Sequence, residues 1–69
     1  MIDMDCKGIW KNANKEVIEY RFHVVARSDN KALMKAMTEI ERFAILMKDV
    51  LVEFDYVGME VEGVVGQYE

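Results

Sequence analysis

Apolar and polar residues alternate along the segment from Val17 to Arg27. Its even-numbered positions are apolar or aromatic, and most of its odd-numbered positions are charged. A period of two in a segment rich in β-branched and aromatic residues predicts a half-buried β-strand. A weaker strand is predicted from Met4 to Lys11, and the asparagines of Asn12–Lys15 suit the turn between the two strands. The pattern therefore predicts an N-terminal β-hairpin.

The period changes to 3.6 residues over residues 30–48. Ser28 and Asp29 precede this segment, and both side chains can accept hydrogen bonds from the unpaired amides of a first helical turn. Apolar residues then recur on one side of the predicted helix, as expected for a stripe that faces a core. Met34 and Ile45 are exceptions, because they project from the polar side. The predicted stripe consists of Ala32, Leu33, Ala36, Met37, Ile40, Phe43, Ala44 and Met47.

Alternation returns after Asp49 and predicts a second hairpin. One strand is expected over residues 50–57 and another over residues 59–65. Gly58 lies between them and supplies the conformational freedom that a tight turn needs. Gly63 predicts a bulge within the last strand.

The predicted fold class is α+β, a single small domain over residues 1–69 with the element order ββαββ. One helix is expected to cover one face of an antiparallel four-stranded sheet. The strand order 2-1-3-4 makes every neighbouring pair antiparallel, and a right-handed crossover is favoured. The residues expected to be buried together between sheet and helix are Phe22, Val24, Ile40, Ala44, Val52 and Phe54.

The net charge of −4 is unevenly distributed along the chain. Residues 1–31 hold six basic and five acidic side chains, whereas residues 32–69 hold three basic and eight acidic ones. Nonspecific binding to nucleic acid needs a basic surface that releases counterions, so nucleic acid is not expected to be the main partner. No apolar stretch is long enough to cross a bilayer, so no membrane-spanning segment is predicted.

Candidate catalytic and metal-binding residues are few. The single cysteine, Cys6, cannot form an internal disulfide and favours a reducing, cytoplasmic location. One cysteine and one histidine cannot supply the usual zinc site, and the pair Asp3 and Asp5 lacks a third metal ligand. Alternation places Cys6 and His23 on opposite faces of the sheet, so they do not form a nucleophile–base pair. We therefore expect no enzyme activity, no metal and no other cofactor.

Four acidic side chains are expected to crowd one face of the predicted C-terminal hairpin. Like charges opposite one another destabilise a sheet, so this face is an ordinary solvated surface, a docking surface for a basic protein partner or a mimic of nucleic-acid phosphate. The lack of a catalytic set, the single sign of charge and the surplus of apolar surface favour docking. The predicted function is therefore a small non-enzymatic protein-interaction module. Such a module would act as an inhibitor, adaptor or regulator, like small accessory proteins of bacteria or phages. The expected docking residues are Glu53, Asp55, Glu60 and Glu62.

Two other classes of function stay open at this stage. One is a homo-oligomer that binds a small anionic or nucleotide-like ligand at a subunit interface. The other is a hydrolase or lyase built across such an interface, although no catalytic set supports it. The residues expected to bind the anionic ligand are Trp10, Arg21, His23 and Arg27.

The chain is expected to form a homodimer. Below about 70–80 residues, one core rarely supplies more than about 3–5 kcal/mol, and disulfides, metals or association make up the rest. The sequence offers neither a disulfide nor a metal site, so association remains. The sheet face away from the helix is predicted to carry the apolar interface, formed by Ile9, Val17, Val25, Leu51 and Val57.

Overall fold

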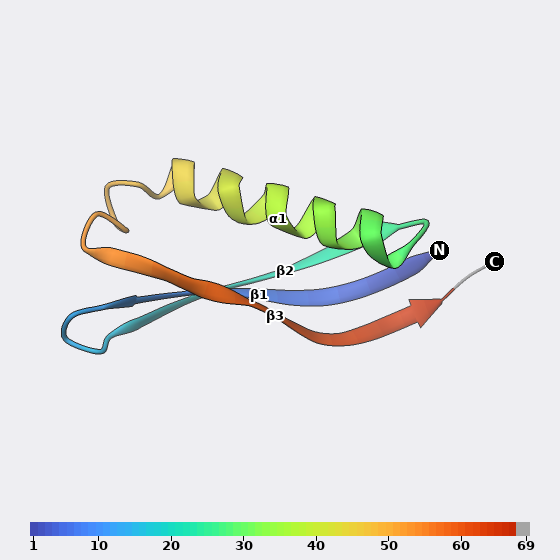
Figure 1. The fold of residues 1–69 in the computed structure, drawn as a ribbon, viewed down its shortest axis with the longest axis horizontal. Helices are drawn as coiled ribbons and strands as arrows, with labels where there is room; N and C mark the ends of the chain where they lie inside the picture. Colours follow the sequence, from blue (N-terminus) through green and yellow to red (C-terminus); the bar gives the residue numbers. More distant parts are fainter. Residues whose placement is uncertain (68–69) are drawn as a thin grey trace.

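A computed structural model describes the backbone of residues 1–67 and the side chains of residues 1–63. Strands β1 (Ile2–Asn12) and β2 (Val17–Ala26) are followed by helix α1 (Asp29–Leu46) and strand β3 (Phe54–Gln67). The strands form one antiparallel sheet in the order β2-β1-β3, and α1 lies along one face of it (Figure 1). The α+β class is therefore confirmed, with the element order ββαβ.

The N-terminal hairpin forms as the alternation predicts. Asn12 organises the turn, because its side-chain oxygen accepts hydrogen bonds from the amides of Asn14, at 3.0 Å, and Glu16, at 2.9 Å. Lys15 adopts the left-handed conformation, with φ of 65°. The alternating burial of β1 and β2 then places their apolar positions under the helix.

Helix α1 begins where the capping residues predict. The Ser28 hydroxyl accepts a hydrogen bond from the Lys31 amide at 3.3 Å, and satisfies one of the amides left unpaired in the first turn. Ala32 and Ala36 are completely buried against the sheet, and their small side chains allow the helix to approach it closely.

The prediction of a second hairpin and a four-stranded sheet is wrong. Residues 47–53 form turns, and the residues from Phe54 onward form one continuous strand that pairs along the whole length of β1. Gly58 lies inside this strand opposite Ile9, at a register shift that the long β1–β3 pairing accommodates. A register shift also occurs beside Gly63, where a bulge is predicted. The consequence for the side chains of residues 64 and 65 lies outside the described side chains.

The core consists of two clusters beneath α1. Of the predicted core residues, Val24 and Ile40 are buried, while Phe22, Ala44 and Phe54 are partly buried. The prediction that Val52 is buried is wrong. This residue is 78% exposed, because it lies in the turns after the helix and not in a strand. The buried members of the two clusters are Ile2, Met4, Cys6, Val24, Ala26, Ala32 and Ala36 in one, and Trp10, Ile40 and Leu51 in the other.

Candidate docking surfaces

The sheet face away from α1, called here the open face, carries a network of ion pairs between strands. The Lys7 ammonium on β1 lies 3.0 Å from Glu19 on β2 and 3.6 Å from Glu60 on β3. Arg21 on β2 lies 3.4 Å from Glu62 on β3. The pKa of Lys7 is raised above its ordinary value, chiefly by its hydrogen bond to the Glu19 carboxylate. The charges of this face therefore largely neutralise one another.

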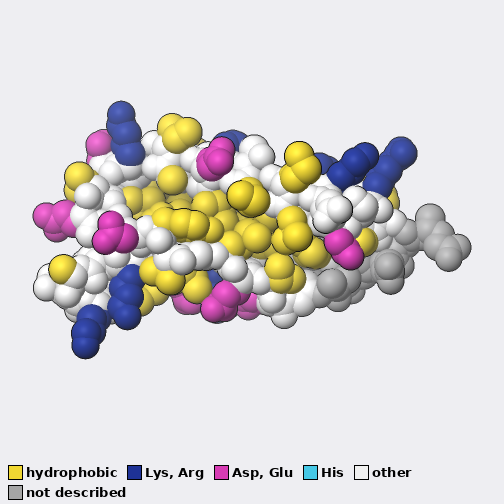
Figure 2. Space-filling model, in the orientation of Figure 1, with side chains coloured by type: hydrophobic (Ala, Val, Ile, Leu, Met, Phe, Trp, Pro, Cys, Tyr) yellow, Lys and Arg dark blue, Asp and Glu magenta, His cyan; other side chains and the backbone are white. Residues whose placement is uncertain are grey.

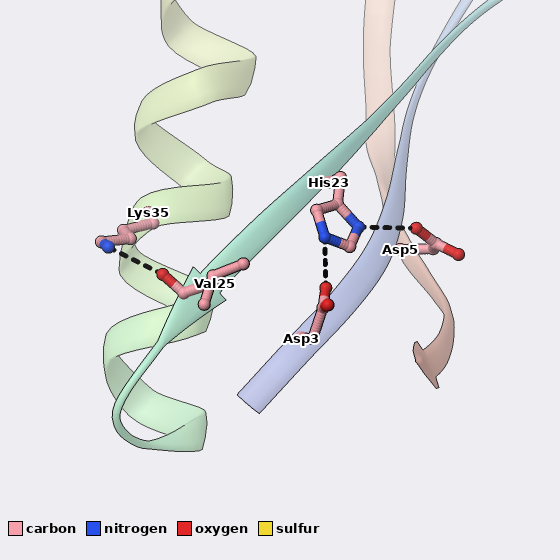
Figure 3. Close-up of polar contacts among 5 residues, drawn as sticks. All are labelled: Asp3, Asp5, His23, Val25 and Lys35. Atoms are coloured by element: carbon pink, nitrogen blue, oxygen red, sulfur yellow. Dashed lines mark hydrogen bonds and ion pairs between the residues drawn. The ribbon is translucent and has the colours of Figure 1, made fainter. Parts of the chain in front are cut away.

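His23 lies between two carboxylates of the neighbouring strand (Figure 3). Its Nδ1 is 3.0 Å from the Asp5 carboxylate, and its Nε2 contacts Asp3. Both ring nitrogens can donate hydrogen bonds only when the imidazole is protonated. The pKa of His23 is accordingly raised, first by the hydrogen bond to Asp5 and also by the charges of the two carboxylates. This cluster holds β1 and β2 together at one end of the sheet.

The four acidic residues predicted to form one docking surface are divided among different environments. Glu53 lies in the turns before β3 and is exposed, and Asp55 lies in the register position opposite Lys11. Glu60 and Glu62 lie beside basic side chains of the other strands. The expected acidic hairpin face is therefore not formed, because the two predicted strands are replaced by the single strand β3.

The residues predicted to bind an anionic ligand are not brought together either. Trp10 is 3% exposed and packs under α1, with ring contacts to Phe43 and Tyr56. Arg21 and His23 lie on the open face, paired with carboxylates, and so cannot share a site with the indole.

The remaining candidate residues, Arg27 and Cys6, lie in different environments. Arg27 follows the end of β2 and is exposed. The Cys6 thiol is buried, and burial raises its pKa, on the sheet face opposite His23. The described residues contain no group of three side chains able to hold a metal ion.

The predicted dimer interface on the open face is also incomplete. The prediction that Leu51 lies on the open face is wrong. This residue is buried in one cluster with Trp10, since it belongs to a turn and not to a strand. Val17 and Val57 are exposed, whereas Ile9 and Val25 are partly buried. Together with the ion pairs, these scattered residues do not form a continuous apolar surface.

A larger apolar surface lies on the β3 side of the helix. Within the described residues, no Cα atom of α1 approaches β3 within 8 Å, because the helix lies over β1 and β2. The gap exposes a hollow of ≈ 290 Å³ beside the Trp10 ring. Figure 2 shows apolar side chains gathered between α1 and β3 along this side of the molecule. We call this surface the apolar flank, and define it as Leu33, Met37, Ala44, Tyr56 and Val61.

Sequence reasoning missed the apolar flank because Leu33 and Met37 were assigned to the core. They are 38% and 59% exposed. The predicted helix stripe contains eight residues and is wide for a helix that rests on two strands. The excess width of the stripe indicates that the helix has apolar side chains beyond those that the two strands can cover.

A basic groove lies on the opposite side of the helix, between α1 and the outer edge of β2. Its volume is ≈ 590 Å³. The Lys35 ammonium crosses it and donates a hydrogen bond of 2.7 Å to the carbonyl oxygen of Val25 (Figure 3). The side chains that define this basic groove are His23, Val25, Lys31, Met34, Lys35 and Arg42.

Comparison of the chain with protein-family models, with curated proteins and with solved structures finds no match. Among the described residues, no helix is both long and apolar enough to cross a membrane. The fold and its surfaces define a small α+β domain with two unpartnered surfaces, one apolar and one basic.

Proposed function

We propose that this protein is a non-enzymatic interaction module that works as a homodimer, assembled through the apolar flank. The observation that carries the proposal is the uncovered helix-facing side of β3. Tyr56 and Val61 are 52% and 45% exposed there, and Tyr56 lines the same hollow as Met37 of the helix. Contiguous apolar patches of this kind are uncommon on monomers and usually mark an interaction site.

The dimensions of the chain support a second copy as the occupant. The accessible surface is 5119 Å², whereas a compact monomer of 8.0 kDa exposes about 4,500 Å². The chain therefore exposes more surface than a compact domain of its mass, as an elongated fold with an uncovered flank does. The radius of gyration of 13.1 Å likewise exceeds the about 11 Å expected for a compact chain of this length.

The two sheet edges are poor routes to self-association. The β3 strand shows three register shifts against β1, and bulges of this kind disrupt a continuous edge. At the β2 edge, the Lys35 ammonium occupies an outward carbonyl oxygen. Association through the faces is therefore favoured. A two-fold axis beside the apolar flank would lay α1 of each copy over the exposed β3 of the other, which is a self-complementary arrangement.

Sedimentation equilibrium of the full chain and of two lysine variants tests this proposal. The wild type should have a mass of about 16 kDa, twice the chain mass of 8.0 kDa. Met37→Lys should shift the protein to monomer, because it places a charge in the proposed interface. Met34→Lys is the matched control, since Met34 is 68% exposed on the same helix but lies outside the flank.

The expected helix signal in circular dichroism confirms that each variant is folded. Both methionines are exposed, so neither substitution disturbs the core. A wild type that remains monomeric throughout the micromolar range would overturn the proposed dimer. Equal dissociation of the two variants would show that the interface lies elsewhere.

A further inference from the structure

We propose that the basic groove binds an acidic, extended peptide segment of a partner protein, which adds to β2 as a further strand. This inference rests on the proposed role as an interaction module, and gives that module a class of ligand. Strand addition to a free sheet edge is a common mode of peptide recognition, in which backbone hydrogen bonds supply affinity and side chains supply specificity.

The outer edge of β2 has no strand partner in the described sheet, although Lys35 has to be displaced before another strand can pair there. In the sheet order β2-β1-β3, β2 pairs on one side only. Alternate residues of an antiparallel edge strand direct their amide and carbonyl groups away from the sheet. Val25 is one of them, since its carbonyl oxygen accepts a hydrogen bond from the Lys35 ammonium of α1.

The walls of the groove determine the charge of the segment that fits. Lys31, Lys35 and Arg42 extend into the groove from α1. His23 also lines it, but its imidazole is engaged by Asp3 and Asp5 and adds no free positive charge. The acidic residue lining the groove is Glu39, which is already engaged by Arg42 at 3.1 Å and by the Tyr20 hydroxyl at 3.0 Å. Lys31 has no ion-pair partner among the described residues. A protein of net charge −4 thus presents a groove of the opposite sign.

The Lys35 contact suggests how the groove opens. An incoming peptide N–H can replace the Lys35 ammonium on the Val25 carbonyl oxygen, so that no buried acceptor is left unpaired. The released ammonium is then free to pair with a carboxylate of the ligand, which is a stronger, charge-assisted contact. Until that exchange, Lys35 protects the edge against unwanted strand pairing, as lysines at sheet edges commonly do.

Neither a second copy nor a nucleic acid fits this groove as well. The acidic strand of a second copy is β3, whose bulges disturb its edge. Pairing of β2 with β3 of another copy would be heterologous and would not close into a dimer. Nucleic acid binding relies on many phosphate contacts, and the groove offers few cations on a chain that is acidic as a whole.

Fluorescence anisotropy with three blocked, labelled peptides tests the proposal. The first alternates Glu with Thr or Val, the second replaces each Glu by Lys, and the third is the acidic peptide N-methylated along one backbone edge. The acidic peptide should bind at least about tenfold more tightly than the lysine peptide. N-methylation should abolish binding, because it removes the donors that pair with β2.

Protein variants locate the binding to the groove. Lys35→Met keeps the aliphatic stem but removes the ammonium, and should weaken binding of the acidic peptide about tenfold. Lys48→Met, an exposed lysine beyond the end of α1, is the matched control and should bind as the wild type does. Binding should persist in Met37→Lys, so that loss of the dimer and loss of the peptide site are separate results.

Several results would overturn the proposal. These are equal binding of the acidic and lysine peptides, unchanged binding of the N-methylated peptide, wild-type affinity of Lys35→Met, or no binding of any peptide. Displacement of the acidic peptide by an oligothymidylate at lower concentrations than by unlabelled peptide would assign the groove to nucleic acid instead.

Discussion

Substitution of Gly8 by alanine should destabilise the protein, although alanine normally suits a strand better than glycine does. Gly8 lies in β1 directly beneath the Trp10 ring. A Cβ atom at this position would lie 2.9 and 3.0 Å from two carbons of that ring and 3.3 Å from the Cδ1 atom of Ile40. Carbon atoms pack at about 3.5–4.0 Å, so the indole has to move.

The cost follows from the lack of space around the indole. Trp10 is 3% exposed, and Phe43 and Tyr56 hold its ring at centroid distances of 5.1 and 5.4 Å. Overpacking of this kind typically costs about 1–3 kcal/mol. In a domain of this size, each kcal/mol lowers the melting temperature by roughly 4–8 °C. We therefore expect Gly8→Ala to melt at least about 5 °C below the wild type.

Gly63→Ala is the matched control. It makes the same substitution in the same sheet, but a Cβ atom there would meet nothing within 4 Å. Its lower chain entropy in the unfolded state should leave stability unchanged or raise it by up to about 1 kcal/mol. Thermal melts at one fixed protein concentration measure both variants, and the emission of the single tryptophan reports displacement of its ring. A Gly8→Ala protein as stable as Gly63→Ala would refute the close packing of Gly8 beneath Trp10.

Two further substitutions test the turns after α1 and the histidine cluster. Leu51→Ala should cost about 2–4 kcal/mol and Val52→Ala less than about 0.5 kcal/mol in urea unfolding, since the first side chain is 8% exposed and the second 78%. Equal costs would contradict the burial of Leu51 and the exposure of Val52. The raised pKa of His23 means that its contribution to stability is complete below about pH 6.5, the ordinary value, and is lost as the pH rises through the folded-state value. The melting temperature should therefore fall between pH 6.5 and mildly alkaline pH, and less so in His23→Gln; an identical pH dependence of the two proteins would remove His23 as the cause.

The first half of the fold could be predicted because its signals are local. Period-two alternation from Val17, the asparagine turn and the Ser28 cap each act within a few residues, and the structure confirms all three elements. The C-terminal half could not be predicted in the same way. Glycine is typical of turns, yet Gly58 lies within β3. The turns that follow α1, residues 47–53, contain neither glycine nor proline.

Those turns are formed by main-chain hydrogen bonds. The amides of Val50 and Leu51 donate to the Met47 carbonyl oxygen at 2.9 and 2.8 Å, and the Phe54 amide donates to Leu51 at 2.9 Å. The length of β1 then favours one long strand over a hairpin. Its eleven residues all pair with β3, whereas a short hairpin strand would leave part of β1 unpaired on that side. Such long-range pairing leaves no mark in local periodicity.

Prediction of the candidate surfaces also required the long-range pairing of the strands and the position of the helix. Arg21, Glu60 and Glu62 were candidate residues in the sequence, but which charges meet is set by register. Lys7 lies between Arg21 and Glu60 in the paired strands, and this placement brings opposite charges together on the open face. The apolar residues of the flank and the cations of the groove were likewise visible, but their grouping follows from where α1 rests.

The position of α1 over β1 and β2 explains why the two unpartnered surfaces are so different. On the β3 side the helix leaves core residues uncovered, so that surface is apolar and its natural complement is another apolar surface. On the β2 side the helix overhangs a strand edge, so backbone groups and lysine side chains meet there. Because the two surfaces lie on opposite sides of one helix, occupation of the apolar flank by a second copy would leave both basic grooves facing outward. The proposed dimer would then present two equivalent peptide sites, and a partner with two acidic segments would bind it more tightly than a partner with one.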